Sequence, residues 1–147
     1  MGAGTKSLML VLLDSNIFFS AMIVPRSLPA RIINEWLDGR FELVTCQEQI
    51  DEIRKASRNP KFRKDLKPSL VGAMLNNLYD SAVWPQPIPR KHHAADPTDS
   101  YLLDLIDAAQ PDYAITGDKR AGLLQRDTLG RTKFLTATAF CEQVLHL

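Results

Sequence analysis

Hydrophobic and polar positions follow two different periods along the chain, one typical of buried strands and the other of amphipathic helices. Residues 8–13 form a continuous apolar run, which predicts a strand covered on both faces. Residues 29–37 place their apolar side chains three or four positions apart, as on one face of a helix. The same patterns predict further strands at 41–45, 113–116 and 133–136, and further helices at 47–58, 68–79, 99–109 and 137–145.

The order of these elements predicts an α/β protein. Strands that alternate with helices favour a parallel sheet with helices on both of its faces. The segment 84–89 holds three prolines, so we predict an extended connector within one domain. Because 147 residues is about the usual size of one domain, we expect residues 8–147 to form a single domain after a flexible lead-in at residues 1–7.

Composition limits the kinds of partner that the chain can have. Eighteen Lys and Arg residues offset seventeen Asp and Glu residues, which leaves a formal charge of +1. This excludes a partner held by net charge alone, so a nucleic-acid site has to be a local basic patch. Cys46 and Cys141 form no zinc-binding or disulfide pattern, and we expect both to be buried. The apolar run 8–13 is too short to cross a membrane, so we predict a cytoplasmic protein with no membrane partner.

Two aspartates follow predicted strands at the points where the strands end. Asp14 comes directly after residues 8–13, and Asp118 comes just after residues 113–116. Because the carboxyl ends of parallel strands meet at one edge of a sheet, we expect these two carboxylates to share a crevice. Aspartate is also common in turns and at helix N-termini, which is the structural alternative for each of them.

Three further acids stand at positions from which they can join this crevice. Asp96 and Asp99 lie where a loop enters a predicted helix. Glu52 borders the buried face of the helix 47–58, and Glu48 and Asp51 are competing choices on the same helix. Their structural alternatives are a helix N-cap and a solvated helix surface. Carboxylates gathered in one place repel one another, and a hard divalent cation relieves the repulsion. Oxygen ligands suit Mg²⁺ or Mn²⁺ rather than Zn²⁺, and such an ion supports phosphodiester hydrolysis.

Four segments carry these acids in an order that resembles a known family. Residues 12–16, 48–53, 96–102 and 115–119 resemble the motifs of the PIN-domain ribonucleases, in particular the toxin components of bacterial toxin–antitoxin pairs. The resemblance covers residues 8–147 and implies a three-layer α/β/α sandwich with a central, mainly parallel sheet. It also implies cleavage of RNA with Mg²⁺ or Mn²⁺, a homodimer, and a cognate antitoxin protein as a partner.

The resemblance also implies a role for each matching residue. Ser15 and Asn16 would orient the first acid or a metal-bound water, and Thr116 is similarly placed beside the fourth acid. The three aspartates among the four acids would bind the metal ion. The predicted catalytic acids are Asp14, Glu52, Asp99 and Asp118.

Two positions depart from the family pattern. Arg120 stands where many relatives carry a further acid, and Ser100 stands where a basic residue is usual. Neither change removes one of the four acids, so we still expect activity. Asp96 is expected to act as a secondary metal ligand that compensates for Arg120.

RNA has to approach an acidic crevice, so we expect cations on its rim. The segment 54–64 holds six of the eighteen basic residues, which indicates a phosphate-binding surface. Two more cations follow the fourth acid directly. The predicted RNA-binding residues are Arg54, Lys55, Arg58, Lys119 and Arg120.

Two other functions compete with the nuclease hypothesis. A phosphoacceptor domain also places an aspartate at a strand end, but it needs paired acids at the first strand, where Ser15 and Asn16 follow Asp14. A catalytically silent module that binds RNA or a protein would keep the fold without the chemistry, and Arg120 gives this alternative some support.

Overall fold

The computed structural model describes residues 8–62, 64–93, 97–117 and 128–147, and only the backbone of residues 97–99. Within these residues the sheet has the strand order β2-β1-β3-β5-β4. Neighbouring strands are parallel except for β4 and β5, which are antiparallel. This confirms the predicted α/β class with a mainly parallel sheet. The strands are β1 (Leu10–Leu13), β2 (Glu42–Val44), β3 (Tyr113–Thr116), β4 (Thr128–Leu129) and β5 (Thr132–Thr136).

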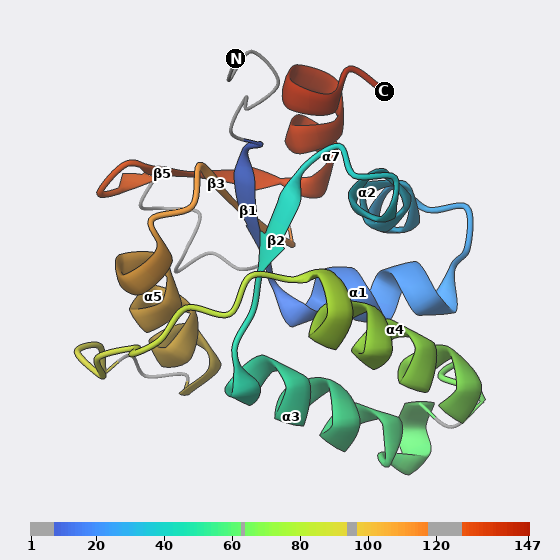
Figure 1. Ribbon diagram of the computed structural model, residues 1–147. Coiled ribbons are helices and arrows are strands. Elements are labelled where there is room, and N and C mark those ends of the chain that lie inside the picture. The colour runs from blue at the N-terminus through green and yellow to red at the C-terminus, as the bar shows by residue number, and fades with distance from the viewer. Residues whose placement is uncertain (1–7, 63, 94–96, 118–127) are drawn as a thin grey trace.

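Helices cover both faces of the sheet (Figure 1). Buried side chains of α1 to α4 form one core with one face of the sheet, whereas α5 packs on the other face around a second core. The arrangement is the expected three-layer sandwich. No helix in the described part of the chain is long and apolar enough to span a bilayer. The helices are α1 (Ser15–Ile23), α2 (Leu28–Leu37), α3 (Gln47–Ser57), α4 (Pro68–Ser81), α5 (Pro97–Ala109) and α7 (Ala137–Phe140), with a 3₁₀ turn η2 (Pro60–Phe62) and a π-helical turn η3 (Cys141–Leu145).

The strand β1 lies in the middle of the sandwich because its side chains are apolar on both faces. Val11 and Leu13 belong to the larger core, and Leu12 belongs to the smaller core that α5 covers. Side chains alternate along a strand, so the position after Leu13 faces α5 again. That position is Asp14, which lines a small gap together with Leu12 and the α5 residue Leu102. The strand therefore delivers one carboxylate to the α5 side of the carboxyl edge of the sheet.

Two elements differ from those that the hydrophobic pattern predicts. The pattern predicts no helix at residues 15–23, where α1 lies. Ile17, Phe18, Ala21 and Met22 of α1 are all buried, so the helix has no simple polar face that would reveal its period. The strand β4 is also missing from the prediction, because a strand of two residues carries no detectable alternation.

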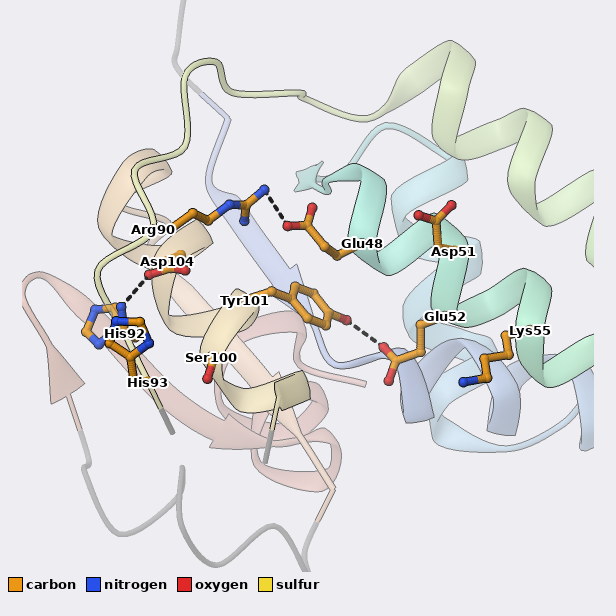
Figure 2. Close-up of a pocket in the computed structure, with 10 residues that line it drawn as sticks. All are labelled: Glu48, Asp51, Glu52, Lys55, Arg90, His92, His93, Ser100, Tyr101 and Asp104. Carbon is orange, nitrogen blue, oxygen red and sulfur yellow. Dashed lines mark hydrogen bonds and ion pairs between the residues drawn. The ribbon is translucent and has the colours of Figure 1, made fainter. Parts of the chain in front are cut away.

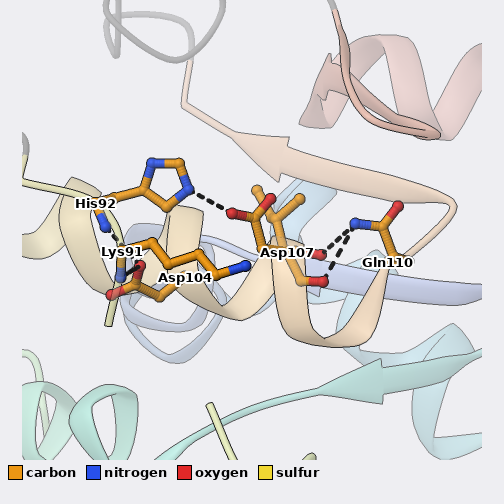
Figure 3. A network of polar contacts seen from close by, with 6 residues as sticks. Lys91, His92, Asp104, Asp107 and Gln110 are labelled. Carbon is orange, nitrogen blue, oxygen red and sulfur yellow. Dashed lines mark hydrogen bonds and ion pairs between the residues drawn. The ribbon is translucent and has the colours of Figure 1, made fainter. Parts of the chain in front are cut away.

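A connector after α4 crosses to α5 and is fastened there. The backbone N–H groups of Lys91 and His92 both donate to Oδ1 of Asp104, at 2.9 Å each. The His92 ring lies 2.6 Å from a carboxylate oxygen of Asp107, one helical turn further along α5 (Figure 3). Asp104 is buried, and its two backbone partners satisfy the carboxylate without a cation. These bonds hold the connector over α5, where it forms one wall of a pocket.

Candidate active site

Asp14 lies at the carboxyl end of β1, where the chain passes directly into α1. Its backbone N–H donates to the carbonyl of Ile115 in the neighbouring strand β3 at 2.9 Å. Its side chain caps α1, because Oδ1 accepts from the N–H of Asn16 at 3.2 Å. Only 2% of Asp14 is exposed. The capping role and the site role therefore coincide, since the cap fixes the direction of a buried carboxylate at the sheet edge.

Glu52 reaches the same edge from α3. The Ser15 hydroxyl, next to Asp14 in the chain, donates to Oε1 of Glu52 at 2.5 Å. The Tyr101 hydroxyl of α5 donates to the same oxygen at 2.6 Å (Figure 2). The two hydroxyl oxygens are 3.1 Å apart. The structure thus brings Glu52 and Ser15 into direct contact next to Asp14, and it ties α1, α3 and α5 together at one point.

Gln49 fixes the position of α3 beneath this contact. Its Nε2 donates to the carbonyl of Leu13 at 2.7 Å and lies 3.5 Å from the Ser15 hydroxyl. Its Oε1 accepts from the Thr45 hydroxyl at 2.7 Å. Gln49 and Thr45 have no exposed surface. Burying an amide costs free energy unless the amide is hydrogen-bonded. The bonds of Gln49 therefore fix the position of α3 relative to the carboxyl ends of β1 and β2.

Burial controls the protonation of two groups around the site. It raises the pKa of the Tyr101 phenol far above its usual range, and the Glu52 carboxylate raises that pKa further. It also raises the pKa of the Cys46 thiol to about 12. Cys46 and Cys141 are free and buried, as predicted. At neutral pH Tyr101 is therefore a hydrogen-bond donor to Glu52, and Cys46 is a neutral thiol.

The carboxylate of Asp14 shares a small gap with a second predicted residue, Thr116. Thr116 ends β3 and is 2% exposed, and its hydroxyl oxygen has no hydrogen-bond partner among the residues that the structure describes. The gap has a volume of about 10 Å³, and its other described walls are apolar. Buried hydroxyls are nearly always hydrogen-bonded, so a group beyond the described residues has to satisfy this oxygen. Asn16, in contrast, is exposed at the start of α1.

These donors fit a hard divalent cation. Carboxylate and hydroxyl oxygens are the ligands that Mg²⁺ and Mn²⁺ prefer. Among the described side chains, no three His, Cys, Asp or Glu residues gather closely enough to bind a metal ion. Asp99 lies in the first turn of α5 by its backbone, and its side chain is outside the described part. Asp96, Asp118, Lys119 and Arg120 also lie outside the described residues.

A pocket of about 630 Å³ opens beside Glu52, between α3, α5 and the connector (Figure 2). Lys55 lies on its α3 wall, one turn after Glu52 and two turns after Glu48. Arg90 of the connector forms an ion pair with Glu48 across the pocket. The charge of Glu48 is therefore compensated within the protein. Lys55 is the predicted RNA-binding residue that stands at the pocket itself.

The two other predicted cations of α3 lie elsewhere. Arg54 donates to the hydroxyl of Tyr79 in α4 at 3.3 Å. Tyr79 in turn stacks on Trp84, with the ring centroids 5.3 Å apart. Arg58 is exposed at the C-terminus of α3. Within the described residues, Arg54 thus contacts α4, whereas Lys55 lines the pocket, and the phosphate-binding surface predicted over residues 54–64 stays a prediction.

Two residues that build the site are absent from the sequence prediction. Gln49 stands at a buried position of a helix, where an amide is unusual and signals a buried hydrogen-bond partner. Tyr101 stands two residues after Asp99 at the start of an otherwise aliphatic stripe. A single hydroxyl group in an apolar stripe indicates a buried hydrogen bond, but the hydrophobic pattern does not show that the partner of Tyr101 is Glu52.

Comparison with known proteins supplies one match. A family model described as the PIN domain matches residues 10–120, which is most of the chain. The match spans Asp14, Glu52 and Asp99, as well as Asp118. Comparisons with curated proteins and with solved structures gave no match.

Proposed function

The chain belongs to the PIN-domain family, whose members are generally nucleases, and we propose that it is a divalent-metal-dependent ribonuclease that hydrolyses phosphodiester bonds of RNA. The observation that carries this proposal is the contact between Ser15 and Glu52. It joins the acid of α3 to the residue that follows the buried Asp14. Two carboxylates from distant parts of the chain are thereby held at the carboxyl edge of a parallel sheet, where such folds bind their ligands.

The acids supply the metal site in this proposal. Asp14 would bind the ion together with Asp99 and Asp118, and Asp96 would be a secondary ligand. When bound, Mg²⁺ or Mn²⁺ lowers the pKa of a coordinated water and neutralises charge on a phosphoryl group. The cap on α1 holds Asp14 in place for this role, and Thr116 lies beside it.

Substrate contacts fall on the pocket next to Glu52. Lys55 supplies a positive charge at its α3 wall. A phosphate group is attracted to such a charge through a mainly electrostatic, salt-sensitive interaction. Arg54 bonds Tyr79, and neither Arg54 nor Arg58 lines this pocket, so within α3 we assign the first phosphate contact to Lys55.

The resemblance to toxin components also suggests a role for the protein in the cell. We propose that the chain is the toxin of a type II toxin–antitoxin pair, that it forms a homodimer, and that a cognate antitoxin protein binds it. Induced expression should then arrest bacterial growth, and co-expression of the neighbouring gene product should restore it. Growth at the rate of an empty-vector control, with the protein present in the soluble fraction, would contradict the toxin role.

The test of the enzymatic proposal is cleavage of a labelled single-stranded RNA by the purified chain. We expect cleavage with Mg²⁺ or Mn²⁺ and none with EDTA. A separate titration of Mn²⁺ by electron paramagnetic resonance measures ion binding without any substrate. A chain that neither cuts RNA nor binds Mn²⁺ at millimolar concentration would be the catalytically silent module instead.

A further inference from the structure

The hydroxyl of Tyr101 in α5 contacts Glu52 in α3. Tyr101 lies in the segment 96–102, in which the family resemblance gives a role to Asp99 but none to Tyr101. We propose that Tyr101 is a positioning residue, which fixes the Glu52 carboxylate through a hydrogen bond to one of its oxygens. This inference rests on the proposed ribonuclease function. It concerns a residue that contacts neither metal nor RNA and acts through Glu52.

The first support is the number of donors on a single oxygen. Oε1 of Glu52 accepts from Ser15 at 2.5 Å and from Tyr101 at 2.6 Å. A carboxylate oxygen offers about two lone-pair sites, so these two hydroxyls fill Oε1. Both bonds are short and charge-assisted, which makes them stronger than bonds between neutral groups. The two hydroxyl groups therefore hold the Glu52 carboxylate in one orientation.

The second support is the burial of Tyr101, which is 8% exposed. A buried hydroxyl needs a hydrogen-bond partner, and the Tyr101 hydroxyl donates to Oε1 of Glu52. The Ser15 hydroxyl donates to the same oxygen, so the three oxygens form one cluster.

The third support is the position of the cluster in the fold. Tyr101 lies in α5 two residues after Asp99, Glu52 lies in α3, and Ser15 follows Asp14 at the end of β1. The helices α3 and α5 pack on opposite faces of the sheet, and β1 belongs to the sheet itself (Figure 1). The tyrosine hydroxyl therefore links the helix that carries Asp99 to the helix that carries Glu52.

The test is the variant Tyr101→Phe, with Tyr113→Phe as a matched control. Phenylalanine keeps the ring and removes only the hydroxyl. Tyr113 lies at the opposite end of the sheet, where its ring packs 5.8 Å from that of Phe140. We expect Tyr101→Phe to lower kcat about ten- to a hundredfold with KM almost unchanged, because it removes a hydrogen bond to a charged group. Tyr113→Phe should retain wild-type kcat within about twofold.

A double-mutant cycle then tests whether Tyr101 acts through Glu52. In a Glu52→Gln background, measured under single-turnover conditions, Tyr101→Phe should cost much less than it costs in the wild type. Equal losses in both backgrounds would overturn the positioning role. So would a Tyr101→Phe enzyme as active as Tyr113→Phe, and in that case the ribonuclease function would stand. If wild-type protein itself cuts no RNA, the proposed function fails first and the positioning role fails with it.

Discussion

The two ends of the central sheet both carry aspartates next to β-strands, yet the two ends treat them differently. At the amino end, Asp112 precedes β3 and accepts from the N–H of Leu10 at 2.8 Å. Its other oxygen forms an ion pair with Arg131, which precedes β5. At the carboxyl end, Asp14 follows β1 and accepts from the backbone N–H of Asn16.

The difference lies in the partners of the carboxylates. The guanidinium group of Arg131 neutralises the negative charge of the Asp112 carboxylate. Asp14 accepts from a backbone N–H and Glu52 accepts from two hydroxyl groups, and these donors orient the two carboxylates. Carboxylate oxygens that converge at one edge of a parallel sheet are the ligands that a hard divalent cation prefers. We infer that the amino end is built for stability and the carboxyl end for function.

The sharpest way to break this comparison is the pair of variants Asp14→Asn and Asp112→Asn. We expect Asp14→Asn to lower kcat/KM on RNA by about a hundredfold or more, because it removes a charge that acts in the transition state. Asp112→Asn should keep its activity and lose about 1 kcal/mol of unfolding free energy, because its partly exposed ion pair is lost. RNA cleavage and urea denaturation measure the two effects. Equal activity of the two variants would mean that the ends do not differ in function.

A second pair of variants compares the buried side-chain amide of Gln49 with the half-buried side-chain amide of Gln110. Gln49→Ala leaves the Leu13 carbonyl and the Thr45 hydroxyl without their partner, so we expect a loss of about 2 to 4 kcal/mol of unfolding free energy. Gln110→Ala, at the amino end, removes bonds of 3.3 Å to the carbonyls of Ile106 and Asp107 and should cost less than about 1 kcal/mol. Urea unfolding of both variants gives the comparison. A smaller loss for Gln49→Ala than for Gln110→Ala would show that Gln49 does not hold α3 in place.

Most of the fold could be predicted from the sequence because burial on the two faces of a sheet leaves a simple pattern. The run at β1 is apolar throughout, and α2 has its buried residues on one side. Gly39 correctly ends α2, since its φ of +82° suits glycine. The pattern fails at α1, which is buried on more than one side, and at β4, which has only two residues.

Less of the site could be predicted, because its contacts join residues far apart in the chain. A strand end followed by an acid is a local pattern, and it identified Asp14. The bond between Ser15 and Glu52 spans 37 residues, and that between Glu52 and Tyr101 spans 49. No periodicity encodes such distances. Only the packing of α3 and α5 on the sheet brings Tyr101 to Glu52.

A third pair of variants tests the electrostatic side of the comparison with a smaller effect. Lys55 lines the pocket beside Glu52, whereas Lys133 is exposed at the start of β5, opposite Tyr113. We expect Lys55→Gln to raise KM for RNA by about three- to tenfold at low salt. The slope of log affinity against log salt concentration should also decrease in magnitude by about one. Lys133→Gln should change neither quantity. Cleavage assays over a range of KCl concentrations measure both quantities. An equal shift for both variants would indicate a diffuse effect of net charge.

The last comparison concerns the thiol of Cys46, which lies just after the carboxyl end of β2 and has the smallest expected effect on activity. Burial raises the pKa of its thiol from 9.0 to about 12, so the folded state favours the protonated thiol. Its contribution to stability is complete below pH 9 and is lost as the pH rises towards 12. In a Cys141→Ala background, the folded protein should therefore react with a thiol reagent at pH 8 at least about a hundredfold more slowly than the unfolded chain. The stability advantage over a Cys46→Ala variant should also shrink above pH 9. Rapid labelling of Cys46 in the folded state would mean that the carboxyl end opens to water, and the rigid placement of Glu52 by α3 would then have to be abandoned.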